Sequence, residues 1–539
     1  MKKESIDVDK LPFSKLFTDY LAQNDTLSQY FETSPFDENS IKQHAENFDF
    51  GSDRTKVVDL LTDFHKNFDT PKSAFDQIKK LQKENTLAVV TGQQLTLYGG
   101  PLFTIYKTLT AIIFAKRWSA LLDRPVIPVF WLADEDHDIE EVIKLTFPQN
   151  SSTSSIEYKH SYNSSEVPPV SNVKFDAEFE QFKNEVGDVL DRTDFFDDLW
   201  NRLHSAYKTG ETFRSAFGSW LLHIFKGEGL ILAGSNVKHI KQFSRGLLSK
   251  AVKNSEQIYS ALENTTHNLI DDLYHGQVQV HPSNLFFIDD SGARQKIQSE
   301  GQNWQTQDRS WSTDELKEQI EESPERFSPN VFLRPILQDH LLPTIGYVAG
   351  PGETAYYAQM KEMYHTFDRK LPVIIPRFSI TLVESAIDRI LEKLPFEVQT
   401  YNDRIEDLEK RFVDQTEEID IEKFFGIWKQ QMEDLTSAKK DEIKEIDPSL
   451  AGSAGKAKAV YFSELDKLKG KVYRSVKQQE NVQLNRISKI KNNLFPNGNL
   501  QEREIAFIYF MNKYGNDIWI ELMALMEDDI PDNHKLIYL

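Results

Sequence analysis

The sequence predicts an α/β protein with a parallel-sheet core, inserted subdomains and a long α-helical antiparallel coiled coil. Two observations carry this prediction. Residues 87–133 read as an apolar strand, a glycine-containing turn, a helix and a second apolar strand, the order of a βαβ unit. Residues 386–447 and 455–494 are charged and poor in glycine, and their apolar positions alternate three and four apart, as in a coiled coil.

The core is predicted to contain short buried strands joined by helices. Leu87–Thr91 and Val126–Ala133 are apolar runs, and the helix between them begins near Leu102. The segment HLLPTIGYVAGPGETAYYAQM repeats the order of strand, turn and helix, and LPVIIP follows as another strand. Residues 150–185 are rich in Ser, Asn and Pro, which indicates an insertion.

The two charged helices are predicted to form an antiparallel hairpin, because Pro448 and the following SLAGSAG interrupt the pattern. A two-helix hairpin leaves an apolar stripe exposed, which favours a homodimer through the coiled coil. The alternative is an intramolecular brace without a partner. We expect core segments at 1–149 and 221–385, the latter with a small insertion, an inserted subdomain at 150–220, the hairpin at 386–500, and a helical segment packing on the core at 501–539.

Composition excludes several classes of function. The formal net charge is −21, which disfavours binding to nucleic acid or to an anionic membrane. The chain has no cysteine, so it can hold no thiolate-bound metal and use no cysteine nucleophile. No apolar run approaches the roughly 20 residues that span a bilayer, and the N-terminus lacks the apolar part of a signal peptide. We therefore expect a cytoplasmic protein.

The first candidate site is TGQQLTLYGGPLFTIYK, which follows the first strand. In open α/β sheets, ligands bind at the carboxyl ends of strands near helix N-termini. The spacing matches neither a P-loop nor a dinucleotide-binding turn. The alternative is a plain strand-to-helix connection with structural glycines. The predicted substrate-binding residues are Gln93, Gly99, Gly100, Thr104 and Lys107.

The second candidate site is the acidic stretch directly after the second strand. Asp134, Glu135, Asp136 and His137 lie nearest the strand end and are the predicted catalytic residues. Such a cluster would hold an ammonium group and accept a proton from an amine nucleophile. The alternative is that two or three of these acids stabilise the first turn of a helix. We expect no zinc site, since no second His or Cys stands at a ligand spacing.

The third candidate site combines a Gly-Pro-Gly turn with two arginines. Gly350, Gly352, Glu353 and Tyr356 follow a predicted strand and are assigned to substrate binding. Arg334 and Arg377 could each grip a substrate carboxylate, since guanidinium binds carboxylates through two hydrogen bonds. The alternatives are helix-dipole stabilisation for Glu353 and surface ion pairs for the arginines. All three candidate sites are expected to converge above one edge of the sheet.

Four blocks resemble the bacillithiol-biosynthesis cysteine-adding enzyme family. They are TGQQLTLYGGPLFTIYKTLTA, PVFWLADEDHDIEEV, LRPILQDHLLPTIGYVAGPGETAYYAQ and PVIIPRFSITLVE, and LFPNGNLQER extends the resemblance towards the C-terminus. The resemblance implies a Rossmann-like core similar to nucleotidylyl transferases and class I aminoacyl-tRNA synthetases, with connecting-peptide-like insertions and a coiled coil that supports a dimer.

The same resemblance implies a ligase that joins the carboxyl group of L-cysteine to the amine of glucosaminyl-malate, giving bacillithiol. Condensing a carboxylate with an amine requires activation, so ATP or another adenine nucleotide is the expected co-substrate, and magnesium is compatible with it. The histidines of the synthetase signature are absent, which argues against synthetase-style adenylation. The alternative is a non-catalytic assembly or metabolite-sensing protein with a coiled coil and a retired nucleotide-binding core.

Overall fold

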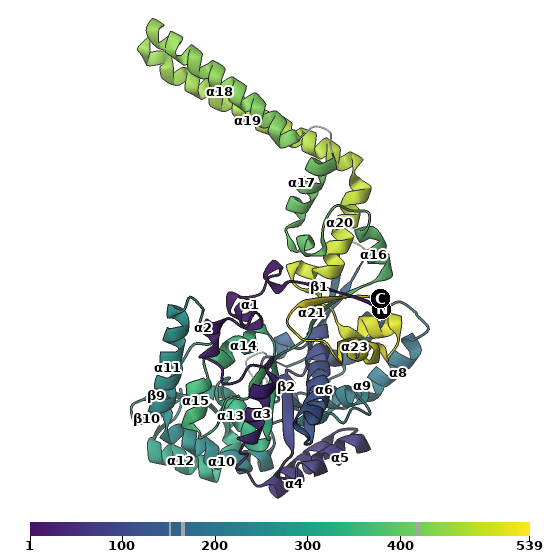
Figure 1. The fold of residues 1–539 in the computed structure, drawn as a ribbon, viewed down its shortest axis with the longest axis vertical. Helices are drawn as coiled ribbons and strands as arrows, with labels where there is room; N and C mark the ends of the chain where they lie inside the picture. The colour runs from purple at the N-terminus through teal and green to yellow at the C-terminus, as the bar shows by residue number, and fades with distance from the viewer. Residues whose placement is uncertain (150–151, 163–167, 417–419) are drawn as a thin grey trace.

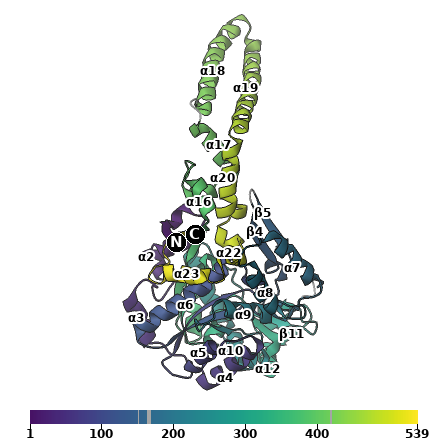
Figure 2. The same ribbon diagram turned by 90° about the vertical axis from the view of Figure 1, so that its right-hand side faces the viewer.

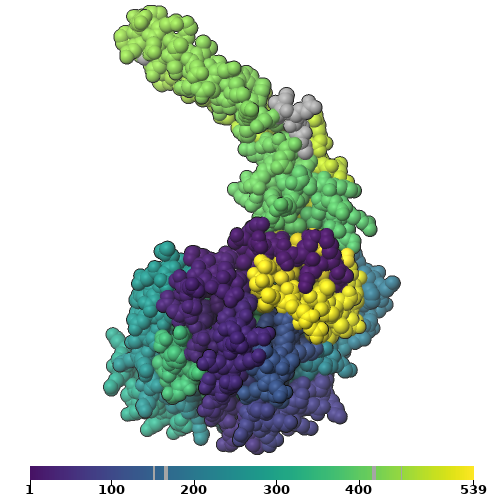
Figure 3. Space-filling view, in the orientation of Figure 1, coloured from purple at the N-terminus to yellow at the C-terminus, as the bar shows by residue number. Residues whose placement is uncertain are grey.

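The protein has a globular body from which a long pair of helices projects (Figures 1 and 2). The computed structural model describes residues 1–149, 152–162, 168–416 and 420–539. The N-terminal and C-terminal segments lie side by side on the surface of the body (Figure 3). The projecting helices are called the arm below and comprise α17 (Ile405–Thr416), α18 (Ile421–Ile446), α19 (Ala451–Gln479) and α20 (Asn481–Leu494).

The centre of the body is a parallel sheet of five strands, as the sequence predicts. Its strands are β2 (Leu87–Gln93), β3 (Val126–Leu132), β6 (Ile231–Ala233), β13 (Thr344–Ala349) and β14 (Val373–Pro376), in the order β14-β13-β2-β3-β6. The chain builds β2, β3 and β6 outward in one direction and then returns to place β13 on the other side of β2. The direction of winding therefore reverses between β2 and β13.

The strands are apolar on both faces because both faces are covered. Every residue of β3 and of β13 is buried, and all of β2 is buried except its last residue, Gln93. The crossover helix α6 (Leu102–Leu122) has apolar residues on all sides and packs against β2, β3 and β13. Burial on all sides explains why this helix lacks a polar face.

Other helices of the body surround the sheet. The N-terminal helices α4 and α5 contact β6, α3 contacts α6, and α14 contacts β13 and β14. These helices are α1 (Lys15–Leu21), α2 (Asp25–Ser28), α3 (Glu38–Glu46), α4 (Arg54–Phe64), α5 (Lys72–Lys80), α10 (Lys238–Lys253), α11 (Ser255–Asp271), α12 (Thr313–Glu322), α13 (Leu333–Leu341), α14 (Pro351–Ala358) and α15 (Lys361–Thr366).

Two inserted regions interrupt the core. The first contains the hairpin β4 (Lys144–Pro148) and β5 (Thr153–Glu157) and three helices, α7 (Glu178–Val189), α8 (Phe196–Ala206) and α9 (Phe213–Ile224). The second holds two small antiparallel sheets. Their strands are β7 (Leu285–Ile288), β8 (Arg294–Lys296), β9 (Gln298–Glu300), β10 (Asn303–Gln305), β11 (Ser310–Ser312) and β12 (Phe327–Pro329).

A three-stranded sheet joins the two ends of the chain. Strand β16 (His534–Tyr538) lies between β1 (Lys2–Ile6), to which it is antiparallel, and β15 (Ser379–Val383), to which it is parallel. Between the arm and β16 come α21 (Gln501–Glu504), α22 (Phe507–Tyr514) and α23 (Ile518–Met526), whereas α16 (Ser385–Leu391) follows β15. The helical segment expected at 501–539 is thus divided into several helices, and Gly515, with φ of 96°, ends α22.

The arm is the antiparallel helical hairpin that the sequence predicts. Helices α18 and α19 run side by side and are joined by the short turn Pro448–Leu450 (Figure 2). The second helical segment is broken at Glu480, which separates α19 from α20. Among the described residues of α18 and α19, the buried ones are Ile421, Phe425 and Leu465. These two helices therefore have little core of their own, whereas the base of the arm, α17 and α20, contributes Leu408 and Ile487 to a buried cluster.

Candidate active site

A cleft of about 460 Å³ lies where the winding of the sheet reverses. Its walls come from the carboxyl ends of β2, β3 and β13, from the start of α14 and from α6. Open α/β sheets bind their ligands at this point, because the loops after neighbouring strands part there. It is called the switch-point cleft below.

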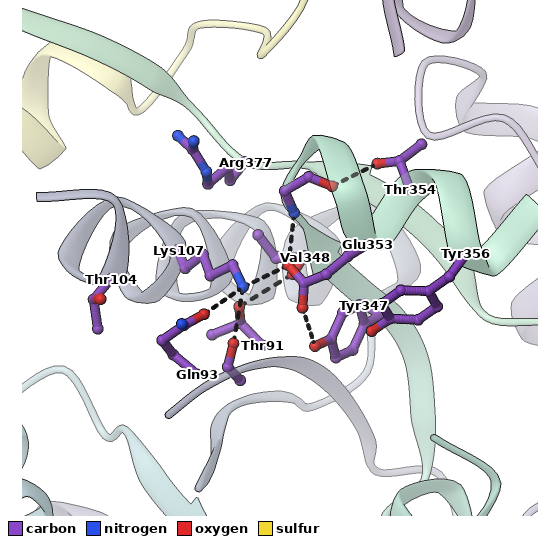
Figure 4. Close-up of polar contacts among 12 residues, drawn as sticks. Thr91, Gln93, Thr104, Lys107, Tyr347, Val348, Glu353, Thr354, Tyr356 and Arg377 are labelled. Carbon is purple, nitrogen blue, oxygen red and sulfur yellow. Dashed lines mark hydrogen bonds and ion pairs between the residues drawn. The ribbon is translucent and has the colours of Figure 1, made fainter. Parts of the chain in front are cut away.

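An ion pair between Lys107 and Glu353 lies in the wall of the cleft (Figure 4). The Lys107 Nζ is 2.5 Å from Glu353 Oε2 and also donates to the Gly92 carbonyl at 2.9 Å and to Gln93 Oε1 at 3.1 Å. Glu353 in turn accepts from the Tyr347 hydroxyl at 2.7 Å. These contacts join α6, β2, β13 and α14 into one polar cluster.

Burial and the neighbouring charges shift the pKa values of this pair in opposite directions. Burial lowers the pKa of Lys107, and the neighbouring Glu353 opposes that shift. Burial alone would raise the pKa of Glu353, but Lys107, the Gly350 amide and the Tyr347 hydroxyl hold it below its usual value. The 2.5 Å contact pairs the Lys107 ammonium group with the Glu353 carboxylate, so each partner offsets the charge of the other.

Gly92 allows β2 and β3 to approach each other at the cleft. A Cβ at this position would stand 2.8 Å from the Trp131 carbonyl oxygen and 3.1 Å from the Trp131 Cβ. Both atoms belong to a neighbouring strand, so they cannot move aside without distorting the sheet. The strand end must therefore be glycine if its carbonyl is to reach Lys107.

A second cavity of about 240 Å³ adjoins the switch-point cleft. The two share Trp131, Ala133, Val331 and Arg334 as lining residues. The second cavity is further lined by Asp134, Glu135, Asp136, Ser235, Arg294, Pro329 and Asn330, and it is called the acidic cavity below. The structure thus brings the second and third predicted sites together.

The helix that the alternative explanation requires after β3 does not form. Asp134 and Glu135 make a turn, and a short 3-10 segment, Ile139–Glu141, follows before β4. Helix-dipole stabilisation of Asp134 to His137 is therefore the wrong explanation for their acidity. Three of the four residues instead line the acidic cavity, whereas His137 does not.

Asp134 anchors the loop that follows β6. Its Oδ1 accepts from the amides of Ser235 and Asn236 at 3.0 and 3.1 Å, and its side chain is fully buried. A Cβ on Gly234 would stand 2.4 Å from Oδ2, so that oxygen is turned towards the same loop. Burial raises the pKa of Asp134 to about 6, while Arg214, 3.9 Å away, limits the shift.

Glu135 and Asp136 differ in how their charges are balanced. Glu135 accepts from the Lys241 ammonium and from the Ser235 hydroxyl, so its charge is neutralised. Asp136 accepts from Gln94 Nε2 at 2.7 Å and forms no ion pair within the described residues, although the Arg294 guanidinium on the same cavity wall acts on it electrostatically. Asp136 is therefore the acid at this cavity that no cation contacts directly.

The side chain of His137 contacts the backbone of its own loop. Its Nδ1 lies 3.1 Å from the Glu135 carbonyl oxygen, and burial lowers the pKa of the ring. The imidazole is therefore neutral at neutral pH. Because it borders neither cavity, its assignment to catalysis finds no support in this geometry.

The first predicted site is only partly correct in its placement. Gln93 and Lys107 line the switch-point cleft, but Gly99, Gly100 and Thr104 line neither cavity. Gly99 and Gly100 have φ of 88° and 71°, and a Cβ on Gly100 would stand 2.2 Å from Thr96 Oγ1. Thr104 is fully buried and lies away from the Lys107 pair (Figure 4). These three residues shape the connection to α6, as the structural alternative holds.

The two predicted arginines have different partners. Arg334 lines both cavities and donates to the Tyr356 hydroxyl at 2.9 Å, so a neutral group accepts from it. Arg377 donates to both carboxylate oxygens of Glu502, at 2.8 and 2.6 Å, and both side chains are buried. Arg377 lines the switch-point cleft, but Glu502 already occupies its guanidinium group. Its assignment to a substrate carboxylate stays a prediction that this ion pair does not favour.

The remaining predicted residues surround the start of α14. Gly350, Gly352 and Glu353 line the cleft together with Tyr356. A Cβ on Gly352 would meet only the Gln277 side chain, at 3.8 Å, so the first turn of α14 opens onto free space. Helix N-termini favour anions, because their first amides have no partner within the helix.

Several lining residues were absent from the predicted sites. Gly92 and Gln94 flank the predicted Gln93, so their position at a strand end was a usable signal. Arg503 lies in the LFPNGNLQER block, whose resemblance was noted without a role for its arginine. Arg294 lines the acidic cavity and Lys241 pairs with Glu135, and both come from distant segments with no local motif, so only the tertiary structure places them there.

Two further observations on the described parts of the chain concern metal ions and membranes. No group of three or more His, Asp or Glu side chains is arranged there to hold a metal ion. None of the helices described is long and apolar enough to cross a membrane.

Comparison with known proteins matches the whole length of the chain. Residues 1–378 match the family described as "Bacillithiol biosynthesis BshC, N-terminal Rossmann-like domain", and residues 380–539 match "Bacillithiol biosynthesis BshC, C-terminal coiled-coil domain". Relatives named "Putative cysteine ligase BshC" include a Salinibacter ruber protein, 31% identical over 96% of this chain and 95% of its own. Another, from Chloroherpeton thalassium, is 30% identical over 98% of this chain and 97% of its own.

Proposed function

The chain belongs to the bacillithiol biosynthesis BshC family, and we propose that it is a ligase that completes bacillithiol. In the proposed reaction, the carboxyl group of L-cysteine and the amine of glucosaminyl-malate form an amide bond. The relatives are named as cysteine ligases, which supports the choice of cysteine. Bond formation requires the amine to lose a proton and the carboxyl group to lose an oxygen.

The observation that carries the proposal is the contact between a cleft with unneutralised cations and a cavity with an unneutralised acid. Arg334 borders both spaces and has no carboxylate partner among the described residues, whereas Asp136 lacks a cationic one. Both substrates carry carboxylate and ammonium groups together. Each would find opposite charge on adjoining walls, with the reacting groups between them.

Asp136 is the proposed acceptor for the proton of the attacking amine. Glu135 is held by Lys241. Asp134 accepts loop amides through Oδ1, and its Oδ2 has no hydrogen-bond partner but is buried against Gly234. Gln94 orients Asp136 through its 2.7 Å hydrogen bond. A carboxylate within hydrogen-bond reach of an ammonium group holds it and accepts its proton as the new bond forms.

An adenine nucleotide is the proposed co-substrate, because a free carboxylate does not condense with an amine in water. When bound, ATP would supply the activation of the cysteine carboxyl group. The fit to this chain rests on charge: Arg334 and the open first turn of α14 face the cleft and suit an anionic phosphate. Magnesium would enter with the nucleotide.

The test is product formation by the purified chain alone. Cysteine, glucosaminyl-malate, ATP and magnesium should yield bacillithiol, detected by mass spectrometry. Glu353→Gln removes the charge opposite Lys107 and should lower the rate about 10- to 100-fold by misplacing the cleft wall. Glu228→Gln breaks an ion pair with Lys116 outside the cleft and should leave the rate unchanged. Equal rates for native protein and Glu353→Gln would contradict the assigned site.

A non-catalytic assembly or sensing protein is the second candidate. The arm favours it, since Phe424, Ile427, Leu435 and Val460 are all more than 45% exposed there. A chain that binds substrates but forms no product alone, and gains activity on addition of a cell extract, would support this candidate over the ligase.

We also propose a cytoplasmic homodimer held by the arm. The exposed apolar side chains of α18 and α19 would be covered by a second copy. Replacing residues 431–463 with a short Gly-Ser linker keeps the Lys429–Asp466 contact at 2.7 Å and removes the outer arm. Light scattering should report half the native mass, and an unchanged mass would refute the arm as the contact. Fractionation of cells should find the chain with cytoplasmic enzymes.

A further inference from the structure

The segment that follows the arm returns to the body at the switch-point cleft. Gln501 and Glu502 are fully buried, whereas Arg503 is exposed and lines the cleft. Gln501 exchanges hydrogen bonds of 2.8 and 2.9 Å with the backbone of Leu382, and Glu502 holds Arg377. Arg503 therefore projects from a firmly held piece of backbone.

The same segment closes the N-terminus of α6. The amide of Leu102, the first residue of that helix, donates to the Ile505 carbonyl at 3.0 Å. The Phe507 amide donates to the Gly100 carbonyl at 3.2 Å. The helix that follows the first strand of the sheet is thus not free to bind an anion with its leading amide, although many α/β proteins use this position for that purpose.

Arg503 brings a positive charge to the place where this helix end is closed. In the part of the chain that the structure describes, its guanidinium group donates no hydrogen bond and has no ion-pair partner. The other cations of the cleft are mostly neutralised, Lys107 by Glu353 and Arg377 by Glu502. Among the described cations of the cleft, only Arg334 likewise has no ion-pair partner, since it donates to the neutral Tyr356 hydroxyl.

The charges of the cleft therefore sum to an excess of two guanidinium groups. A chain with a net charge of −21 repels anions over most of its surface. The two arginines would therefore attract an anion only within the cleft itself. Guanidinium groups bind carboxylates and phosphates through paired hydrogen bonds. A ligand with at least two negative charges would neutralise both arginines at once.

We propose that Arg503, acting with Arg334, binds the polyanionic part of a substrate in the switch-point cleft. Taking the proposed function as given, that part is either the two malate carboxylates or the nucleotide phosphates, which share this chemistry. The C-terminal region that carries the arm thereby supplies a binding residue to the Rossmann-like region. Without residues 501–507 the cleft would lose that charge.

The test measures binding without turnover, by calorimetry on the full-length chain at low salt. Malate and ATP with magnesium are titrated separately into native protein, Arg503→Gln, Arg503→Lys and Arg474→Gln. Arg503→Gln should weaken binding of one or both anions about 10- to 100-fold. The affinity of Arg503→Lys should lie between those of native protein and Arg503→Gln, because lysine keeps the positive charge but cannot form the paired hydrogen bonds. Arg474→Gln, which removes an equal charge from α19, should match native protein.

The anion affected identifies the source: loss for malate alone assigns carboxylates, and loss for ATP alone assigns phosphates. Equal affinities for native protein and Arg503→Gln, or no binding of either anion by native protein, would overturn the proposal. Thermal unfolding of Arg503→Gln should be unchanged, because the side chain makes no contact that supports the fold. Since no product is measured, a failed ligase assay beside a positive binding result would refute the proposed reaction only.

Discussion

The body and the arm use charged residues in opposite ways. In the body, Arg377 and Glu502 are 3% and 0% exposed and satisfy each other completely within the protein. In the arm, Lys429 and Asp466 form an ion pair while 32% and 52% exposed. A buried pair requires one geometry, because either charge alone would be costly, whereas an exposed pair can be replaced by water. The structure of the body therefore depends on specific ion pairs, whereas that of the arm depends on the helical periodicity of its sequence.

The largest effect is expected from breaking the buried pair. Glu502→Gln leaves the Arg377 charge buried without a counter-charge and should lower the free energy of unfolding by about 3–5 kcal/mol. Asp466→Asn, the matched change in the arm, should cost less than about 1 kcal/mol. Urea denaturation followed by circular dichroism measures both. Similar costs for the two variants would remove the distinction between the regions.

The next effect concerns the pH dependence of the body. Burial raises the pKa of Asp134 from 3.8 to about 6, so the folded state binds its proton more tightly than the unfolded state. Stability from this group is complete below about pH 4 and is lost as the pH rises to about 6, by about 3 kcal/mol. The Asp134→Asn variant should not show this loss of stability as the pH rises.

The measurement is the difference in unfolding free energy between Asp134→Asn and native protein, from pH 4 to pH 7. The unfolding free energy of the variant relative to native protein should increase up to about pH 6 and stay constant above it. No group of the outer arm has a raised carboxyl pKa, among those described, so the shortened-arm protein should follow the native curve. A flat difference across the range would show that Asp134 is solvated in the folded state.

The smallest effects come from the same substitution in the two regions. Gly92→Ala places a Cβ 2.8 Å from a backbone oxygen of β3 and should destabilise the body by about 1–3 kcal/mol. Gly426→Ala, in exposed α18, meets no atom within 4 Å and should stabilise the arm by about 0.5–1 kcal/mol. Thermal unfolding should move in opposite directions, and a shared sign would contradict the comparison.

Local sequence patterns predicted the architecture well. Apolar runs after residues 86 and 125 became β2 and β3, and the three-and-four spacing became α18 and α19. Strand β1 and strand β16 were not predicted, although they pair along five residues. Each is short and lacks alternation of polar and apolar residues, with sequences KKESI and HKLIY, and it becomes a strand only because the opposite end of the chain lies beside it.

The position of a residue at the cleft could be predicted where the residue borders a strand end, but its partners from distant parts of the chain could not. Lys107, Gly350 and Glu353 line the cleft because βα connections place them there. His137 and Arg377 were assigned from their positions beside strands. Their partners, the Glu135 carbonyl and Glu502, could not be read from the pattern.

By itself, the sequence determined the order of strands and helices, the hairpin break at Pro448 and the glycine turn before α14, since each depends on neighbours within a few residues. The tertiary structure alone decided which charges of the site remain available. Arg377 is neutralised by Glu502 from 125 positions away, and Glu135 by Lys241 from 106. Charges act through space, so their balance is settled only when distant segments meet.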